Sequence, residues 1–333
     1  MAGGCGLVRR VEIERLGLAR SMVDRLIRGQ VLVPLANGVY ADPGRLAGIS
    51  SWDLHRLRTR AFLMMSPPNT YAADWSAIAL HELPTIGDPP PVPSVIRPRP
   101  GRSGSNRTVH GRTRFTPVPD RWLGTIGDIP IIGAAFAAVD LGRRADRLTS
   151  LVLADAVAAR HGGREQLAGA LGDIDGWSGE RHAAWAVRHC DVDVESPLES
   201  AGRLAFITAG LPPSRSNEWV GEYVPELRLD HYWPEYRVGA EADGLTKYAH
   251  NPALAIRNEK DREWRIQRLG IRVIRYGWRV AVGSPDALAG QVRELLNAPP
   301  LPARGLRTWS NAQGRALLGI GPSSYARAPT WTR

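Results

Sequence analysis

The stretch Val238-Gly239-Ala240-Glu241-Ala242-Asp243-Gly244 decides which fold we expect for the C-terminal half of this chain. Small and apolar residues alternate over residues 238–241, which predicts a strand, and Asp243-Gly244 is a pair typical of turns. Residues 227–231 alternate in the same way and predict a strand that ends at Asp230. The apolar run of residues 271–276 predicts a third, buried strand.

Helix signals separate these strands. Ser196-Pro197-Leu198-Glu199 is a helix start, and it predicts a helix over residues 197–210. Asn251 as cap and Pro252 at the first position begin a predicted helix that extends to residue 269, where Gly270 ends it. Residues 284–297 predict a closing helix. Helices on a sheet of this order predict a three-layer α/β domain.

Carboxylates gather on the predicted helix start and on the two strands that follow it. Glu199, Asp230, Glu241 and Asp243 are the acids, and Lys247 lies four residues past Asp243. Mg²⁺ takes a few carboxylates and keeps several water ligands. A metal held in this way stabilises the attacking and leaving oxygens of a phosphoryl displacement. The pattern therefore predicts these four acids as Mg²⁺ ligands.

Structural alternatives exist for these acids. Ser196-x-x-Glu199 is a capping box, which accounts for Glu199 without a metal. The turn alone accounts for Asp243. Asp230 lies on an otherwise apolar strand, where a buried carboxylate needs a partner. Glu241 and Asp243 are two residues apart and so are expected on one sheet face, which disfavours burying both without a cation.

The N-terminal residues 7–42 predict a winged helix-turn-helix. Helices are expected over residues 8–16 and about 19–28, with Gly29 in a left-handed position that ends the second helix. Residues 31–40 contain Asn37-Gly38 between two short apolar runs, which predicts a hairpin. The outward arginines of the second helix predict DNA contacts in the major groove. They are Arg20, Arg25 and Arg28. The alternative is a helical hairpin and ribbon that bind another protein.

Charge and composition narrow the function classes. Residues 191–298 have 14 Lys/Arg and 16 Asp/Glu, and residues 299–333 have five Arg and no acid, so residues 1–190 carry a net charge of +7. A basic surface of that kind fits a polyanion. The alternative is compositional bias, because the chain has only two lysines. There is no run of 18 apolar residues, no signal peptide and no cysteine pattern for a metal or disulfide framework, so we expect a cytoplasmic protein without membrane contact.

The middle of the chain is less informative. Residues 51–83 predict helices on both sides of a break at residues 66–69, and residues 86–119 predict an irregular basic segment with one or two strands. Residues 131–189 are alanine-rich and predict helices, where Asp140 and Asp155 are interpreted as solvated or capping acids. The expected regions are a winged helix-turn-helix over 1–60, a mixed then helical middle domain over 61–190, an α/β domain over 191–298 and a disordered basic tail over 299–333.

Residues 196–296 resemble the very-short-patch-repair-like domains of the restriction-endonuclease fold. The matching residues are Pro197-Leu198-Glu199, Asp230, Glu241-x-Asp243-Gly244, residues 257–262 and residues 270–275. The resemblance implies a Mg²⁺-dependent DNA endonuclease in which Asp230 and Glu241 are the metal-binding catalytic pair and Glu199 joins them. The chain departs from the pattern at Asp243, where a lysine is usual, and at Lys247, where a histidine is frequent. Three interpretations stay open: Lys247 supplies the missing catalytic cation from a shifted position, Asp243 binds a second metal, or either substitution marks a domain that kept the fold and lost the reaction.

The N-terminal part resembles the winged-helix domain of AbiEi-type antitoxins. The resemblance rests on Leu26-Ile27-Arg28-Gly29, on Asn37-Gly38-Val39-Tyr40 and on the segment 76–84. It implies a toxin–antitoxin context, with a nucleotidyltransferase-type toxin as genetic partner. Two functions therefore stay open. One is a DNA-binding protein with a metal-dependent endonuclease domain, and the other is a non-enzymatic antitoxin and transcriptional repressor with an inactive nuclease-fold scaffold.

Overall fold

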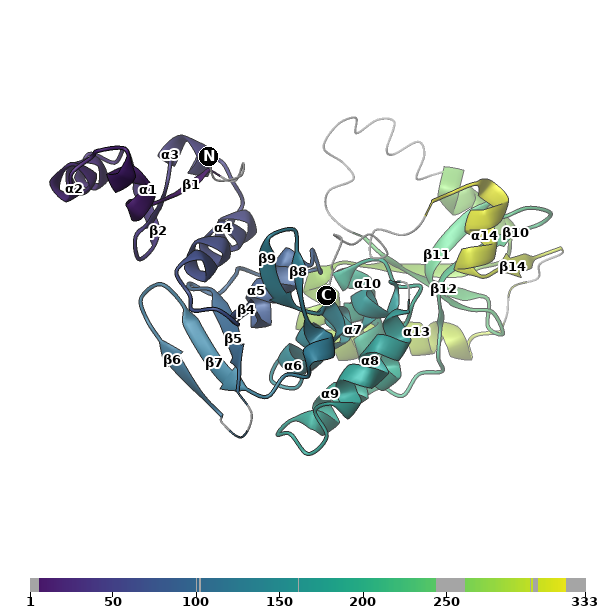
Figure 1. The fold of residues 1–333 in the computed structure, drawn as a ribbon. Helices are drawn as coiled ribbons and strands as arrows, with labels where there is room; N and C mark the ends of the chain where they lie inside the picture. Colours follow the sequence, from purple (N-terminus) through teal and green to yellow (C-terminus); the bar gives the residue numbers. More distant parts are fainter. Residues whose placement is uncertain are drawn as a thin grey trace. The chain divides into compact units, whose positions relative to one another are not determined.

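Within its described residues the chain has a mixed α/β fold with three sheets, whose helices and strands are drawn in Figure 1. The chain divides into two compact units. The computed structural model describes residues 6–99, 101, 103–160, 162–243, 261–299, 301 and 305–321. The described residues of the first unit are 6–99, 101, 103–144 and 168–180. Those of the second unit are 145–160, 162–167 and the described residues from 181 to 321. None of the described helices is long and apolar enough to span a membrane.

The first unit begins with two short helices inserted in a small antiparallel sheet. Its strands have the order β1-β3-β2, so the first strand pairs with the last. The two predicted helices and the hairpin at Asn37-Gly38 are confirmed, whereas β1 was not predicted because its three residues show no alternation. The elements are β1 (Leu7–Arg9), α1 (Arg10–Arg15), α2 (Arg20–Arg28), β2 (Val33–Ala36) and β3 (Val39–Ala41).

A small core and one arginine hold this N-terminal module together. Ile13, Val23 and Tyr40 are buried against one another, from α1, α2 and β3. Arg10 donates to the Tyr40 hydroxyl at 2.7 and 3.0 Å and lies 3.5 Å from the Asp24 carboxylate. One guanidinium therefore joins α1 to α2 and to β3.

Helix α2 ends differently from the prediction. Gly29 has φ −80°, an ordinary right-handed value, and Gln30 takes the left-handed conformation with φ 56°. The Gly29 N–H bonds the Arg25 carbonyl and the Val31 N–H bonds the Leu26 carbonyl, so the helical turn continues through the glycine. The prediction for Gly29 is wrong by one residue.

The rest of the first unit contains a six-stranded mixed sheet and several helices. The strands of the sheet have the order β6-β7-β5-β4-β9-β8. Residues 86–119 contribute three strands, more than the one or two predicted, because β6 consists of small polar and basic residues without an apolar face. The strands are β4 (Tyr71–Ala72), β5 (Ser94–Pro98), β6 (Gly104–Arg107), β7 (Arg112–Thr116), β8 (Leu123–Ile126) and β9 (Ile129–Ile132). The helices are α3 (Pro43–Leu46), α4 (Ser51–Met64), α5 (Asp74–Leu80) and α6 (Ala134–Gly142).

A buried ion cluster joins this sheet to two helices. Arg114 on β7 donates to Asp74 at 2.9 Å and to Asp140 at 2.6 Å, and all three are buried. After the end of α6, Arg143 binds Asp140, and Arg144 binds both carboxylates. Asp140 is thus a paired core residue with 1% of its surface exposed, and its interpretation as a solvated acid is wrong.

The second unit has a five-stranded sheet in the order β13-β12-β11-β10-β14, where only β12 and β13 are parallel. The predicted strand at residue 230 continues to residue 233, and β10 was not predicted. The strands are β10 (Arg215–Gly221), β11 (Leu227–Trp233), β12 (Val238–Ala242), β13 (Arg272–Tyr276) and β14 (Arg307–Trp309). The helices are α7 (Arg147–Ala158), α9 (Glu180–His189), α10 (Pro197–Thr208), α12 (Trp278–Gly283), α13 (Pro285–Asn297) and α14 (Asn311–Leu318), and α8 (Gly163–Gly172) crosses the division between the units.

Helices cover both faces of this sheet. On one face, Leu198 and Phe206 of α10 pack with Val238 and Ala240 of β12. On the other face, Leu229 packs with Ile266 and Leu269. Ile266 lies within the helical residues 261–268, and Leu269 directly follows them. The three-layer arrangement predicted for this region is confirmed for the described residues.

The C-terminal segment differs from the predicted disordered tail. Residues 307–309 form β14, which pairs with β10 through Trp219 and Trp309. Residues 311–318 form α14, whose Gly314 lies so close to Trp219 that a Cβ there would be 2.2 Å from the indole. The high Pro, Gly and Arg content suggested disorder, but the segment contains one strand and one helix. The strand pairs Trp309 with Trp219, and the helix packs on the Trp219 indole.

We predict that Arg114→Met will lower the free energy of unfolding by about 3 kcal/mol, because it leaves two buried carboxylates short of a partner. Arg112→Met is the matched control, since it removes the exposed arginine two residues away on the same strand. We expect it to change stability by less than about 0.5 kcal/mol. Urea denaturation of both variants measures the difference, and equal losses would contradict a structural role for the cluster.

Candidate carboxylate site

Glu199 lies in the first turn of α10 and is held by the start of its own helix. Its Oε1 accepts from the Ser196 hydroxyl at 2.7 Å, and the Ser196 Oγ accepts from the Glu199 N–H at 3.2 Å. Its Oε2 accepts from the Glu195 N–H at 3.0 Å and from the Asn217 amide at 2.7 Å. The Ser196 hydroxyl therefore caps the helix, whereas the Glu199 carboxylate satisfies the N–H of Glu195, one residue before the cap, and also binds β10.

Asp230 lies close to Glu199 in the same unit. Its Oδ2 accepts the Ala242 N–H at 2.8 Å, which fixes the side chain against the end of β12. Burial and the neighbouring Asp230 carboxylate raise the pKa of Glu199 from 4.5 to about 8. The structure thus brings two of the predicted ligands together and keeps Glu199 protonated at neutral pH.

Three residues beside this pair were not predicted. Tyr276 and His231 are buried, and their Oη and Nε2 atoms are 2.6 Å apart. Burial lowers the pKa of His231 to about 3, and burial with the nearby carboxylates of Asp230 and Glu199 raises the pKa of Tyr276. Both groups are consequently neutral at pH 7. The third residue, Asn217, has φ 51°, and its Oδ1 is buried without a partner among the described residues.

Gly202 makes room for the tyrosine. A Cβ at this position of α10 would lie 2.1 Å from the Tyr276 hydroxyl. A glycine inside a predicted helix, here three residues after Glu199, is a sequence signal that another group packs closely against the helix backbone. The sequence alone does not identify that group as Tyr276. Asn217 gave no signal because residues 215–218 of its strand are polar in succession and show no apolar alternation.

Glu241 lies on the other face of the sheet. It is two residues from Gly239, where a Cβ would contact Leu229 and Val273, whereas α10 covers the face that carries Val238 and Ala240. Glu241 Oε1 binds Arg262, and its Oε2 lies 3.4 Å from Arg275. Two arginines therefore balance this carboxylate in place of the cation that the sequence pattern suggests.

Asp243 and Lys247 complete the predicted set. The Asp243 N–H donates to the Tyr276 carbonyl at 2.8 Å, so Asp243 follows the end of β12 beside β13. Lys247 lies in the segment 244–260, outside the described residues. Within the described ranges, no group of three or more His, Cys, Asp or Glu side chains is placed to hold a metal ion. Glu199 and Asp230 are the pair that remains for Mg²⁺, which stays a prediction.

Asp155 is a further buried carboxylate of this unit. It is fully buried on α7 and accepts from Ser200 at 2.7 Å and from Arg203 at 2.9 and 3.0 Å, both on α10. The Asp191 N–H also donates to it, at 2.8 Å. Its interpretation as a solvated or capping acid is wrong, because it joins α7 to the helix that carries Glu199.

The predicted DNA-contacting residues lie in the first unit. Arg20, Arg25 and Arg28 are exposed on α2, and Val23 is its buried residue. In the part of the chain that the structure describes, no carboxylate forms an ion pair with these three arginines. Arg28 donates only to the Asp24 carbonyl, at 3.3 Å. Their charges are available to an external anion.

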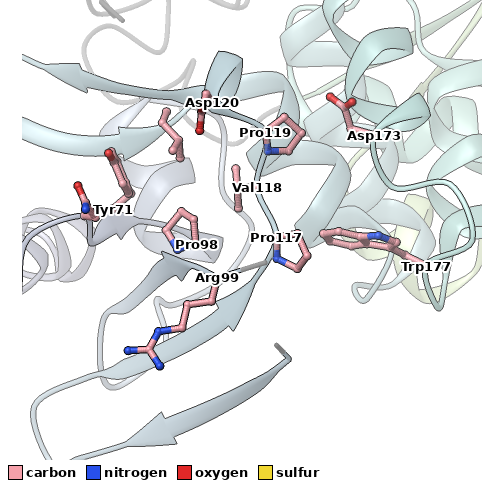
Figure 2. A pocket seen from close by; sticks show the side chains of 11 residues that line it. Tyr71, Pro98, Arg99, Pro117, Val118, Pro119, Asp120, Asp173 and Trp177 are labelled. Carbon is pink, nitrogen blue, oxygen red and sulfur yellow. The ribbon is translucent and has the colours of Figure 1, made fainter. Parts of the chain in front are cut away.

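A pocket of about 610 Å³ lies elsewhere in the first unit. Figure 2 shows Pro98, Pro117 and Pro119 between Tyr71 and Trp177. The polar groups at its rim are partly engaged, since Asp173 binds Arg121 and the Trp122 indole N–H. None of the predicted site residues lines this pocket.

Comparison with known proteins gives relatives without a stated activity. No protein family model matches the chain. Two proteins of Mycobacterium tuberculosis, from strains CDC 1551 / Oshkosh and H37Rv, are each 25% identical over 263 residues, which cover 77% of this chain and 89% of the relative. Both are described as uncharacterized proteins, so the similarity assigns no chemistry to this chain.

We predict a pH-dependent difference in stability between the protein and its Glu199→Gln variant. A carboxyl with a pKa raised from 4.5 to about 8 keeps its proton in the folded state while the unfolded chain releases it. The free energy of unfolding therefore falls as the pH rises from about 5 to about 8, and the glutamine variant lacks this fall. We expect the variant to gain roughly 2 kcal/mol relative to the parent between pH 5.5 and 8.

Denaturant unfolding at several pH values measures this gain. Glu235→Gln, which removes an exposed carboxylate from the turn between β11 and β12, controls for the loss of one charge. A parent-to-variant difference that is constant over this pH range would show that Glu199 is ionised in the fold throughout.

Proposed function

We propose that this protein binds double-stranded DNA through helix α2. The observation that carries the proposal is the row of three exposed arginines on a short helix inside a helix–helix–hairpin module. An α-helix fits the major groove of DNA, and helix-turn-helix proteins place their second helix there. The order β1-β3-β2 supports a winged arrangement in which the hairpin flanks that helix.

The distribution of residues around α2 supports this docking. At about 100° per residue, Arg20, Arg28 and Arg25 occupy an arc of about 140°. Val23 lies on the opposite side, in the core with Ile13 and Tyr40. Asp24 falls within the arginine arc, but it lies 3.5 Å from Arg10. The Arg10 contact offsets this acid and leaves the face basic.

Replacing the three arginines together should weaken DNA binding and flatten its salt dependence. Each phosphate contact contributes about −0.9 to the slope of log affinity against log salt, so Arg20→Ala, Arg25→Ala and Arg28→Ala should reduce the slope by about 2.7. Fluorescence anisotropy with a labelled duplex over a sodium chloride series measures both quantities.

The matched control removes three exposed arginines of the second unit, Arg181, Arg188 and Arg279. We expect this triple alanine variant to retain the parent slope. Equal effects of the two triple variants would show a general charge effect, and a parent protein that does not bind duplex DNA would refute the proposal.

The second candidate function is Mg²⁺-dependent cleavage of DNA in the second unit. The observation that favours it is the Glu199–Asp230 pair, in which the Asp230 carboxylate helps to raise the pKa of the buried Glu199. A divalent cation that replaced the Glu199 proton would offset the repulsion between the two carboxylates. A bound magnesium ion would supply stabilisation of the attacking and leaving oxygens of a phosphodiester. Glu199 and Asp230 would hold it, and Glu241 would instead orient Arg262 and Arg275.

If the site is active, the protein will nick supercoiled plasmid with Mg²⁺ or Mn²⁺, and chelator will abolish the nicking. Asp230→Ala should reduce the rate at least 100-fold, whereas Glu235→Ala, on the exposed turn, should leave it unchanged. Lys247→Ala tests whether that lysine replaces the cation usual at Asp243. Nicking that survives in Asp230→Ala, or its absence from the parent, together with intact DNA binding, would favour the non-enzymatic repressor and antitoxin.

A further inference from the structure

We propose that the β6–β7 hairpin is a second DNA-contacting surface, in which Arg107 and Arg112 bind backbone phosphates of a duplex. We call residues 104–116 the basic ribbon. The inference rests on the proposed DNA binding and extends it to a part of the first unit outside the helix-turn-helix module. It places phosphate contacts on a two-stranded ribbon, a shape that DNA grooves accommodate.

The charge of this region is one-sided. Residues 89–119 contain six arginines and no acid. Arg114 is buried and fully engaged with Asp74 and Asp140. Arg107 and Arg112 are exposed, and no ion pair joins either of them to a carboxylate within the described residues. The ribbon therefore presents cationic charge that the fold itself does not neutralise.

The register of the two strands concentrates this charge. Arg107 and Arg112 are direct partners across the antiparallel pair, so their side chains leave the sheet on the same face. Like charges directly opposite each other destabilise a sheet. A phosphate bound between or beside the two guanidiniums would remove that repulsion, and guanidinium groups match phosphate oxygens in a bidentate geometry.

Protection of a sheet edge explains only part of this pattern. The strand β6 is the edge of its sheet, and charged side chains on edge strands prevent pairing with other chains. Arg107 fits that explanation. Arg112 lies on β7, which has β6 on one side and β5 on the other, so it protects no edge. The opposed pair requires a further reason, and anion binding supplies it.

The ribbon has a firm support in the fold. Its turn contains Gly111, where a Cβ would lie 2.6 Å from the Phe62 ring of α4. The same helix contributes Ala61, Leu54 and Leu57 to the core of the N-terminal sheet. Helix α4 therefore contacts both the basic ribbon and the module that carries α2, so one helix positions two basic surfaces.

The test compares Arg107→Ala/Arg112→Ala with the parent in the full-length protein. We expect a labelled 20-base-pair duplex to bind about tenfold more weakly at 100 mM salt, with a salt slope smaller by about 1.8. Arg107→Lys/Arg112→Lys keeps both charges and should retain most of the slope. Arg188→Ala/Arg279→Ala removes two exposed arginines from the second unit and should match the parent.

Each outcome separates this inference from the proposed function. A duplex affinity and slope unchanged in the double alanine variant, with α2 variants still impaired, would overturn the ribbon surface alone. Weaker binding to single-stranded RNA or anionic vesicles with unchanged duplex binding would also overturn it. Increased light scattering with unchanged duplex binding would assign the arginines to edge protection. A parent without duplex affinity would refute the proposed function itself.

Discussion

Four buried carboxylates in this protein, those of Asp74, Asp140, Asp155 and Glu241, are stabilised by arginines that come from distant parts of the chain. An unpaired charge inside a protein is far more costly than a solvated one, so each buried acid constrains where its partners lie. In the first unit, Arg114 links Asp74 and Asp140 across 40 and 26 residues of sequence. In the second, Arg203 reaches Asp155 over 48 residues. These pairs fix strand β7 on helices α5 and α6, and α10 on α7.

Glu199 departs from this rule, and the departure is what makes its neighbourhood a candidate site. Its partners among the described residues are a hydroxyl, an N–H and an amide, with no arginine. Glu241 follows the rule, because Arg262 and Arg275 neutralise it. Two glutamates predicted for one role thus have opposite electrostatic environments. The position of a carboxylate in a motif does not determine which charge the fold places beside it.

The sequence predicted what depends on local periodicity and turn chemistry. Helices α2, α10 and α13, the Asn37-Gly38 hairpin and strands β11 to β13 all follow from alternation, capping residues or glycine. The sequence did not predict β10 or β6, since their residues are polar and acquire their strand character from neighbouring strands. Asn217 of the candidate site was missed for the same reason. His231 lies on the predicted strand β11 and was missed because its partner Tyr276 comes from β13, 45 residues further along the chain. The opposite faces of Glu199 and Glu241 depend on which helix covers which side of the sheet, and no local pattern contains that information.

The course of the chain between the units limits how the protein can be divided. Residues 168–180 return to the first unit after residues 145–167 have contributed to the second. The segment 168–180 contains Asp173, which binds Arg121, and Trp177, whose ring contacts the Phe136 ring edge-on. A fragment that stops at residue 144 would lack both contacts, and a fragment that begins at 145 would carry an unpaired indole. Gene rearrangements that exchange one unit as a continuous segment are therefore disfavoured, so the two units are expected to be inherited together.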